Sequence, residues 1–254
     1  MENKLKEKYH EIREIGTLKE MLDSSVQLYS ERPAFLVKKE KGGEYFQISY
    51  AQIKNDIDAL GTKLISMGLA DAKIAVIGEN CYEWVASYFA VLNGAGIVVP
   101  LDKELTKDEI YNLLRQAGCR AVFYTQRFEE YFKDFDIEFK IKMKVYGDRT
   151  DPSEPLTPSV QNQAEPGGII SWEALVADGE KLVKEGNRDY IDAEIDPDEM
   201  KILLFTSGTT DSAKGVMLSH FNIASCIMDT CRIAYVAPED RTLSILPIHH
   251  TFES

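Results

Sequence analysis

Short, continuously apolar segments alternate with amphipathic segments of helical length through the first half of the chain. Residues 73–77, 97–99 and 121–124 read Lys-Ile-Ala-Val-Ile, Ile-Val-Val and Ala-Val-Phe-Tyr. Between them, Tyr82–Leu92 and Thr106–Gln116 carry apolar side chains at helical spacing. Strands without a polar side are buried on both faces, and a helix between two of them forms a right-handed crossover. The pattern predicts an α/β fold, a layered and mainly parallel β-sheet with helices on both faces.

The chain divides into four parts around this alternation. A charged stretch over residues 1–30 indicates a helical lead-in, and Phe35–Val37 and Tyr45–Ile48 indicate the two strands of a hairpin. A later segment rich in Pro, Ser, Thr, Asn and Gln cannot build a core and predicts a surface loop. The predicted parts are 1–48, lead-in and hairpin; 49–146, an α/β sheet region; 147–170, the surface loop; and 171–254, a second α/β region that is a fragment of a longer large domain.

The composition limits the classes of partner. Lys and Arg number 29 against 42 Asp and Glu, a net charge of -13, whereas nucleic-acid binding needs a clustered positive surface. We therefore expect no nucleic-acid partner, and an anionic small molecule must be held by a local device. The four cysteines have no CxxC spacing, which predicts buried free thiols and no metal site.

The start of the chain bears on its location. The first residues, MENKLKEKYHEIREIG, are charged and lack the apolar core of a signal peptide, and no apolar run reaches the length of a membrane span. We therefore expect a cytoplasmic protein. The lead-in leaves dimer contacts or peripheral membrane contact open, although its mixed charges are more typical of a solvated helix face.

A loop rich in hydroxyl groups and glycine follows a short apolar segment. Lys201–Phe205 indicates a strand, and the chain then reads Thr-Ser-Gly-Thr-Thr-Asp-Ser-Ala-Lys-Gly. Glycines let the backbone approach a bulky anion, hydroxyl groups donate hydrogen bonds to phosphate oxygens, and a lysine supplies a mobile positive charge. The loop therefore predicts a polyphosphate site, whose binding residues are Thr206, Ser207, Gly208, Thr209, Thr210 and Lys214.

Two other interpretations of this loop are weaker. The P-loop of NTPases has Gly directly before its Lys and Ser or Thr directly after it, whereas Lys214 lies between Ala213 and Gly215. A structural turn with an incidental lysine does not require a strand, a hydroxyl-rich glycine loop and a lysine in this order. Polyphosphate binding explains all three features together.

A pair of histidines follows a second short apolar segment. Residues 243–246 indicate a strand that ends at Pro247, and His249 and His250 come shortly after it. Neighbouring residues at a strand end point in opposite directions, so this pair would make a poor metal chelate. An isolated histidine in this position would be interpreted as a structural imidazole.

The loop and its flanks resemble a known family signature. LLFTSGTTDSAKGVMLSH is similar to the TSGTTGxPKG motif, followed by Val, an apolar residue and Ser-His, of the adenylate-forming superfamily. That superfamily contains acyl-CoA synthetases, luciferases and peptide-synthetase adenylation domains. The upstream sequence resembles its N-terminal sheet region, so the likeness covers most of Ser49–Phe252. The sequence His-His-Thr-Phe-Glu at residues 249–253 and the long lead-in most resemble long-chain fatty-acid–CoA ligases.

The resemblance implies an ATP-dependent, AMP- and pyrophosphate-forming acid-thiol ligase. A carboxylic acid, expected to be a fatty acid, would attack the α-phosphorus of Mg2+-ATP to give acyl-AMP and pyrophosphate, and CoA would then displace AMP. Lys214 and the loop hydroxyls would hold the leaving pyrophosphate. His250, with His249 beside it, aligns with the family's histidine near the acyl carboxylate and the α-phosphate, where it would orient the carboxylate or donate a hydrogen bond.

The sequence departs from the family pattern in two loop positions. Asp211 stands where the family has Gly or Ser, and Ala213 where it has Pro. Asp tolerates the backbone of Gly, but its charge must point away from the polyphosphate or weaken nucleotide binding. We also expect an N-terminal fragment that is inactive alone. The open alternatives are another acyl-adenylating enzyme, such as an aromatic acid–CoA ligase or an adenylation domain, a non-catalytic nucleotide-binding module, and a structural half-domain.

Overall fold

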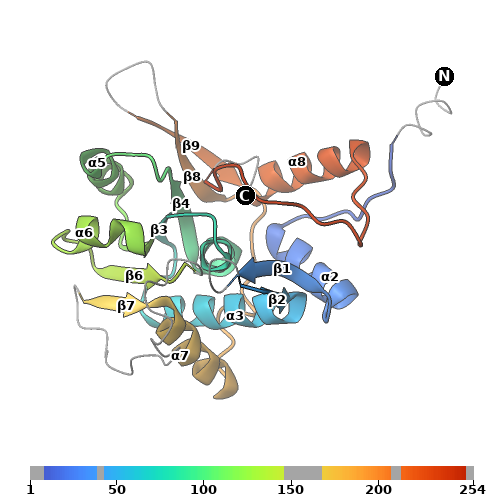
Figure 1. The fold of residues 1–254 in the computed structure, drawn as a ribbon, viewed down its shortest axis with the longest axis horizontal. Helices are drawn as coiled ribbons and strands as arrows, with labels where there is room; N and C mark the ends of the chain where they lie inside the picture. The colour runs from blue at the N-terminus through green and yellow to red at the C-terminus, as the bar shows by residue number, and fades with distance from the viewer. Residues whose placement is uncertain (1–8, 39–42, 146–167, 207–212, 250–254) are drawn as a thin grey trace.

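A seven-stranded sheet forms the centre of the computed structural model, which describes residues 9–38, 43–145, 168–206 and 213–249 (Figure 1). Its strand order is β7-β6-β5-β3-β4-β8-β9, and every neighbouring pair is parallel except β8 and β9. The predicted α/β fold with a mainly parallel sheet is confirmed. The strands are β3 Ala72–Ile77, β4 Gly96–Leu101, β5 Ala121–Thr125, β6 Phe139–Met143, β7 Ile169–Ser171, β8 Met200–Thr206 and β9 Lys214–Ser219.

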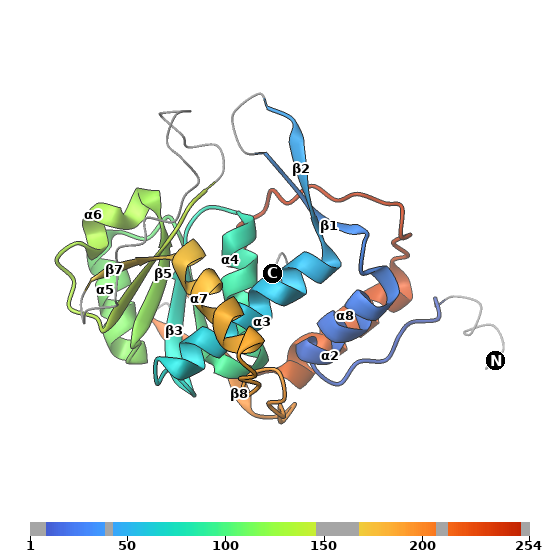
Figure 2. The same cartoon turned by 90° about the horizontal axis from the view of Figure 1, so that it is seen from below.

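Helices cover both faces of the sheet, as the figures show from two sides (Figures 1 and 2). In β3, Ile74 and Val76 pack with α3, α4 and α7, whereas Ala75 and Ile77 pack with α5 and α6 on the opposite face. Within the described ranges, no helix is long and apolar enough to cross a bilayer. The helices are α3 Tyr50–Ser66, α4 Tyr82–Ala90, η1 Val91–Ala95, α5 Lys107–Ala117, η2 Gln126–Phe128, α6 Glu129–Phe132, α7 Trp172–Lys184 and α8 His220–Ile233.

The lead-in is helical over its second half. Helix α2, Leu18–Tyr29, begins at Thr17, whose side chain accepts a hydrogen bond from the Glu20 N–H. Residues 9–17 form no helix, so the prediction of helix over 1–30 is wrong there, and 1–8 lie outside the described residues. The predicted hairpin is confirmed, with β1 Pro33–Lys38 antiparallel to β2 Tyr45–Ser49.

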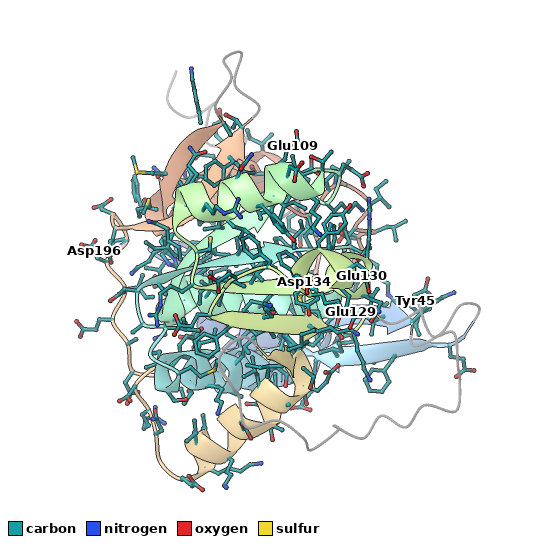
Figure 3. The ribbon with its side chains drawn as sticks, turned by 90° about the vertical axis from the view of Figure 1, so that its left-hand side faces the viewer. Tyr45, Glu109, Glu129, Glu130, Asp134 and Asp196 are labelled. Carbon is teal, nitrogen blue, oxygen red and sulfur yellow. The ribbon has the colours of Figure 1, made fainter. Side chains whose placement is uncertain are left out.

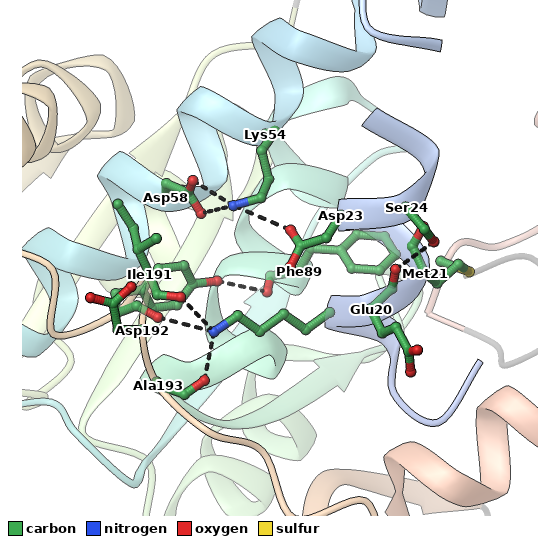
Figure 4. Close-up of polar contacts among 12 residues, drawn as sticks. Glu20, Met21, Asp23, Ser24, Lys54, Asp58, Phe89, Ile191, Asp192 and Ala193 are labelled. Atoms are coloured by element: carbon green, nitrogen blue, oxygen red, sulfur yellow. Dashed lines mark hydrogen bonds and ion pairs between the residues drawn. The ribbon is translucent and has the colours of Figure 1, made fainter. Parts of the chain in front are cut away.

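Lys19 connects α2 to the segment that leads from α7 to β8, which carries Ile191 and Ala193 (Figure 4). Its ammonium donates hydrogen bonds to the backbone oxygens of Ile191 at 2.9 Å and Ala193 at 2.6 Å, with Tyr190 O at 3.4 Å. Beside it, Lys54 of α3 forms an ion pair with Asp23 of α2 at 3.4 Å. These polar contacts add to the apolar packing of α2, because Leu18 and Leu22 of this helix are buried in the main core.

Helices α3 and α7 cross at a glycine. A Cβ atom on Gly179 would lie 1.9 Å from the backbone oxygen of Ala59. Such a distance is far inside any van der Waals contact, so this crossing requires glycine. The close approach fixes how α7 lies over the face that α3 and α4 also cover.

Two local predictions differ from the structure, and one proline lies inside a strand. Pro100 lies in β4 opposite Val76. Among the described residues, β4 pairs with β8 only at Val98 and Ile202, so the missing N–H of Pro100 falls beyond that ladder. Residues 243–246 form no strand. Of the cysteines, all free, Cys81 and Cys119 are half-buried, whereas Cys226 and Cys231 are exposed, which contradicts the prediction of burial.

The predicted internal division of the chain is not settled by these elements. The expected surface loop, 147–170, lies mostly outside the described residues. Ser171 caps α7, because its side chain accepts a hydrogen bond from the Ala174 N–H at 3.1 Å. The four-part division stays a prediction.

Candidate active site

The carboxyl ends of three parallel strands carry the polar residues of the candidate site. Asn80 follows β3, Asp102 follows β4, and Thr206 is the last residue of β8. Helix α4, which connects β3 to β4, lies on one face of the sheet, and α5, which leaves β4, lies on the other. Ligands of open α/β sheets bind outside the carboxyl ends of strands at such a switch point. The edge at β3 and β4 is therefore the expected binding position.

The predicted phosphate loop closes the hairpin between β8 and β9. Thr206 pairs with Lys214 in the antiparallel register, and both side chains are exposed at the root of the loop. The Gln116 side chain of α5 donates a hydrogen bond to the backbone oxygen of Ala213 at 3.0 Å. This bond connects the end of the loop next to Lys214 with helix α5. The strand β9 begins at Lys214, a position expected to be loop. Of the predicted binding residues, Ser207, Gly208, Thr209 and Thr210 lie outside the described residues.

The charge of Lys214 stands out in an acidic molecule. The whole chain has a net charge of -13, and Glu129, Glu130 and Asp134 gather around α6 in Figure 3. The general field therefore repels an anion such as ATP, and a mobile cation beside a hydroxyl group is a local device that can hold phosphate oxygens. Thr206 and Lys214 fit one end of a polyphosphate.

Asn80 holds the segment that precedes the two histidines. Its side-chain amide donates hydrogen bonds to Ser244 Oγ at 3.0 Å and to the backbone oxygen of Leu246 at 2.7 Å. The Ile248 N–H donates to Asn80 Oδ1 at 3.4 Å, and the Ile248 side chain is buried in the core beside α4. One asparagine thus fixes both the path and the direction of residues 244–248 over the end of β3.

His249 reaches the end of the neighbouring strand. Its Nε2 lies 3.6 Å from Asp102 Oδ2, which is ion-pair range for a protonated imidazole and too long for a hydrogen bond. Only 9% of His249 is exposed. His250, the residue predicted to act on the acyl carboxylate, lies outside the described residues. The structure brings the histidine segment to the switch point through His249.

The turn between β3 and Asn80 has a steric requirement. Gly78 has φ +155°, and a Cβ atom on it would lie 2.3 Å from Thr125 Cγ2 at the end of β5. The Thr125 hydroxyl donates a hydrogen bond to Glu79. These contacts position the turn between β3 and α4, from which Asn80 extends.

Asn80 and Asp102 were missed by sequence reasoning. The available signal was their position, because each is a polar residue that closely follows a predicted apolar strand. The edge where carboxyl ends of parallel strands meet is the common place for ligands. Their partners could not be found from the sequence, since Asn80 contacts residues 164 to 168 positions away.

The Ser-His pair that ends the loop signature is structural. Ser219 caps α8 by accepting a hydrogen bond from the Asn222 N–H. His220 is fully buried, its Nδ1 accepts a hydrogen bond from the Leu18 N–H at 3.0 Å, and its Nε2 lies 3.0 Å from the Leu92 backbone oxygen. This pattern requires a neutral imidazole with its proton on Nε2, and burial lowers the pKa of His220. The pair joins α8 to α2 and η1.

Comparison with known protein families identifies the family of this chain. The family model described as AMP-binding enzyme matches residues 22–254. The chain belongs to the AMP-binding enzyme family. Among curated AMP-binding relatives, the mouse (Mus musculus) medium-chain acyl-CoA ligase ACSF2, mitochondrial, is 26% identical over 215 residues, which cover 82% of this chain and 34% of the mouse protein. The rat (Rattus norvegicus) long-chain-fatty-acid–CoA ligase 5 is 29% identical over 222 residues, 82% of this chain and 31% of that protein.

Solved structures of other proteins share the fold. A red-emitting luciferase from Phrixothrix hirtus superposes with a TM-score of 0.71 at 22% identity, over 93% of this chain and 43% of the luciferase. A putative long-chain-fatty-acid CoA ligase from Rhodopseudomonas palustris gives 0.67 at 17% identity, over 92% and 52%. The chain spans about a third of the length of the two acyl-CoA ligases above.

The cofactors of the family fit this chain unequally. Lys214 and Thr206 suit the phosphates of ATP. Across the residues that the structure describes, no group of three His, Cys, Asp or Glu side chains could hold a metal ion, so no Mg2+ ligand is assigned here. No residue is assigned to CoA.

Proposed function

We propose that this chain supplies the ATP phosphate-binding hairpin of an acyl-CoA synthetase, which activates a fatty carboxylic acid as acyl-AMP and transfers it to CoA. The observation that carries the proposal is the position of Lys214. It lies at the root of the β8–β9 hairpin, paired with Thr206, at the sheet edge where the carboxyl ends of β3 and β4 also lie. A cation and a hydroxyl at this edge are placed to bind the triphosphate of ATP.

Lys214 acts on the leaving group in this proposal. When the acyl carboxylate attacks the α-phosphorus, the bond from that phosphorus to the bridging oxygen breaks and pyrophosphate leaves with the electron pair. Lys214 and the loop hydroxyls neutralise the charge that develops on pyrophosphate, so positioning and electrostatics supply the catalysis. Mg2+ bound with ATP would neutralise further charge on the phosphates.

The histidine segment orients the acyl group. Asn80 and Asp102 fix residues 244–249 over the ends of β3 and β4, and His250 continues directly from this segment. His250 would donate a hydrogen bond to the carboxylate or to the α-phosphate oxygen. Asn80 and Asp102 are positioning residues for that imidazole.

The choice of a fatty acid follows the relatives, which include medium-chain and long-chain acyl-CoA ligases. An aromatic acid–CoA ligase or an adenylation domain would use the same loop and histidine, so the acid panel below separates these alternatives. The cytoplasmic location expected from the sequence is part of this proposal, and subcellular fractionation tests it.

Acid-dependent exchange of labelled pyrophosphate into ATP tests the function. It is measured with the polypeptide as the cell makes it, with fatty acids of several lengths, aromatic acids and amino acids. We expect exchange with fatty acids that falls at least about 100-fold in Lys214→Ala, while Lys184→Ala, an exposed lysine on α7, leaves it unchanged. Exchange that needs no acid, or exchange that survives Lys214→Ala, would contradict the proposal.

A further inference from the structure

A cavity lies between the β1–β2 hairpin, α3, α4 and α7, apart from the candidate active site. Its volume is about 460 Å³, within the range of small-molecule sites. Its lining residues include three acids and three aromatic residues, and among the described lining residues none is Lys, Arg or His. None of them belongs to the candidate active site. The six are Glu31, Asp56, Glu83, Phe46, Tyr82 and Trp172.

Glu83 carries an unpaired polar atom in this cavity. The residue lies in the first turn of α4 and is only 2% exposed, yet its Oε2 has no hydrogen-bond partner among the described residues. A buried carboxyl oxygen without a partner is costly, because it has lost water and gained nothing in return. Because this oxygen lies in the wall of a cavity, it can accept a hydrogen bond from a ligand that binds there.

Asp56 and the aromatic residues of the lining indicate which kind of ligand the cavity can bind. The Tyr82 hydroxyl donates a hydrogen bond to Asp56 Oδ2, and Gln52 donates to Asp56 Oδ1 at 2.7 Å. Both oxygens of Asp56 therefore have partners. The Glu83 carboxyl takes hydrogen bonds from its own backbone N–H and from the Cys81 thiol, but its Oε2 has no partner among the described residues and can accept one from a ligand. Tyr82 and Trp172 lie edge to face with their ring centroids 6.1 Å apart. Aromatic faces bind both apolar groups and organic cations.

We propose that this cavity binds a small primary amine with an aromatic or aliphatic body, whose ammonium group donates a hydrogen bond to Glu83. The body of the ligand lies against Tyr82, Trp172 and Phe46. The acidic lining excludes carboxylates and phosphates by charge repulsion. This site is independent of the adenylation function, because its residues include none that the proposed reaction uses.

Calorimetric titration of the chain with four probes of one shape tests the proposal. Benzylamine supplies the ammonium, benzyl alcohol a neutral donor, benzamide a neutral amide and benzoate an anion. We expect benzylamine to bind at least about 10-fold more tightly than benzyl alcohol and benzamide, and benzoate not to bind. A cation preference of this size corresponds to one charge-assisted hydrogen bond.

Substitutions locate the binding. Glu83→Gln should weaken benzylamine at least about 10-fold, whereas Glu130→Gln, a carboxylate on α6, should leave it unchanged. Phe46→Ala should weaken it severalfold through the lost aromatic contact. The Phe46 side chain is exposed on β2, so Phe46→Ala should keep the fold. This variant therefore tests binding in the cavity even if Glu83→Gln does not fold.

The two tryptophans report the position of the ligand directly. Benzylamine should shift the indole N–H resonance of Trp172, assigned with Trp172→Phe, and leave that of Trp84 in place. Equal binding to the wild type and Glu83→Gln, stronger binding of benzamide or benzoate than of benzylamine, or an unmoved Trp172 signal at saturation would each overturn the proposal.

Discussion

Asn80 and Leu246 are 166 positions apart in the chain, yet the side-chain amide of Asn80 donates a 2.7 Å hydrogen bond to the Leu246 backbone oxygen. The same side chain binds Ser244 and accepts from Ile248. The segment before the histidines is therefore not placed by a strand of its own. A single polar side chain at the end of β3 holds it over the switch point of the sheet.

Asn80→Ala should release this segment. Three hydrogen bonds are lost, and the local opening free energy of residues 244–248 should fall by about 1–3 kcal/mol. Hydrogen exchange measured by mass spectrometry should show the peptide around Leu246 exchanging about 10-fold faster or more. Asn187→Ala is the control, because Asn187 makes only near-neighbour hydrogen bonds among the described residues. Equal protection in both variants would contradict the anchoring role.

Gly179→Ala should destabilise the fold although alanine is the better helix former. Helix propensity alone would favour alanine by about 1 kcal/mol. A Cβ atom here would lie 1.9 Å from the Ala59 backbone oxygen, so α3 and α7 must separate, at a cost of about 1–3 kcal/mol or more. Urea denaturation measures the difference. Ala177→Gly, at an exposed position of the same helix, calibrates the propensity, and a stabilised Gly179→Ala would refute the steric account.

The sequence patterns that predicted the fold share a physical basis. Strands such as Ile74–Ile77 are apolar on both faces because helices cover both, so their signal is strong. Strand β6, Phe139–Met143, was missed because lysines interrupt it, although Lys140 is buried and its ammonium donates to the Lys133 backbone oxygen at 3.3 Å. Leu243 and Ile245 suggested a strand, but both side chains are exposed on a segment without regular secondary structure.

The candidate site was only partly predictable, because some of its residues are close in sequence and others meet only in the folded protein. The loop around Lys214 is local in sequence, so its composition is a direct signal. The contacts of Asn80 and Asp102 with residues beyond position 240 form only when the sheet is assembled. The Ser-His pair carried a signature, but the buried contacts that make His220 structural come from α2 and η1.

Acid should destabilise the fold through His220. Its pKa is lowered by burial, so the unfolded chain binds a proton that the folded protein does not as the pH falls below about 6.5. Stability is therefore complete above that pH and is lost toward the folded pKa. His220→Gln should flatten this part of the pH dependence in urea denaturation, while His10→Gln at an exposed position should not. An unchanged slope in His220→Gln would contradict the neutral buried imidazole.

Glu83 should give the opposite pH dependence in an overlapping range, between pH 4.5 and about 7. Burial, with repulsion from Glu173 and Asp56, raises its pKa to about 7 against an ordinary 4.5, although its own backbone N–H opposes the shift. Between these values the folded protein holds a proton that the unfolded chain releases, so stability falls as pH rises, by about 3 kcal/mol in all. Glu83→Gln should remove this loss and be more stable than the wild type at pH 8. Equal slopes of stability against pH in the wild type and in Glu83→Gln between pH 5 and 8 would exclude the shift, and Glu130→Gln should keep the wild-type slope.

Binding of ATP to the hairpin tests the account most directly. Calorimetry of the chain with Mg2+-ATP should give one site whose affinity falls about 10- to 100-fold in Lys214→Ala, since one charge-assisted contact to phosphate is lost. Lys184→Ala should bind as the wild type does. Unchanged affinity in Lys214→Ala would contradict the claim that the β8–β9 hairpin holds the phosphates of ATP.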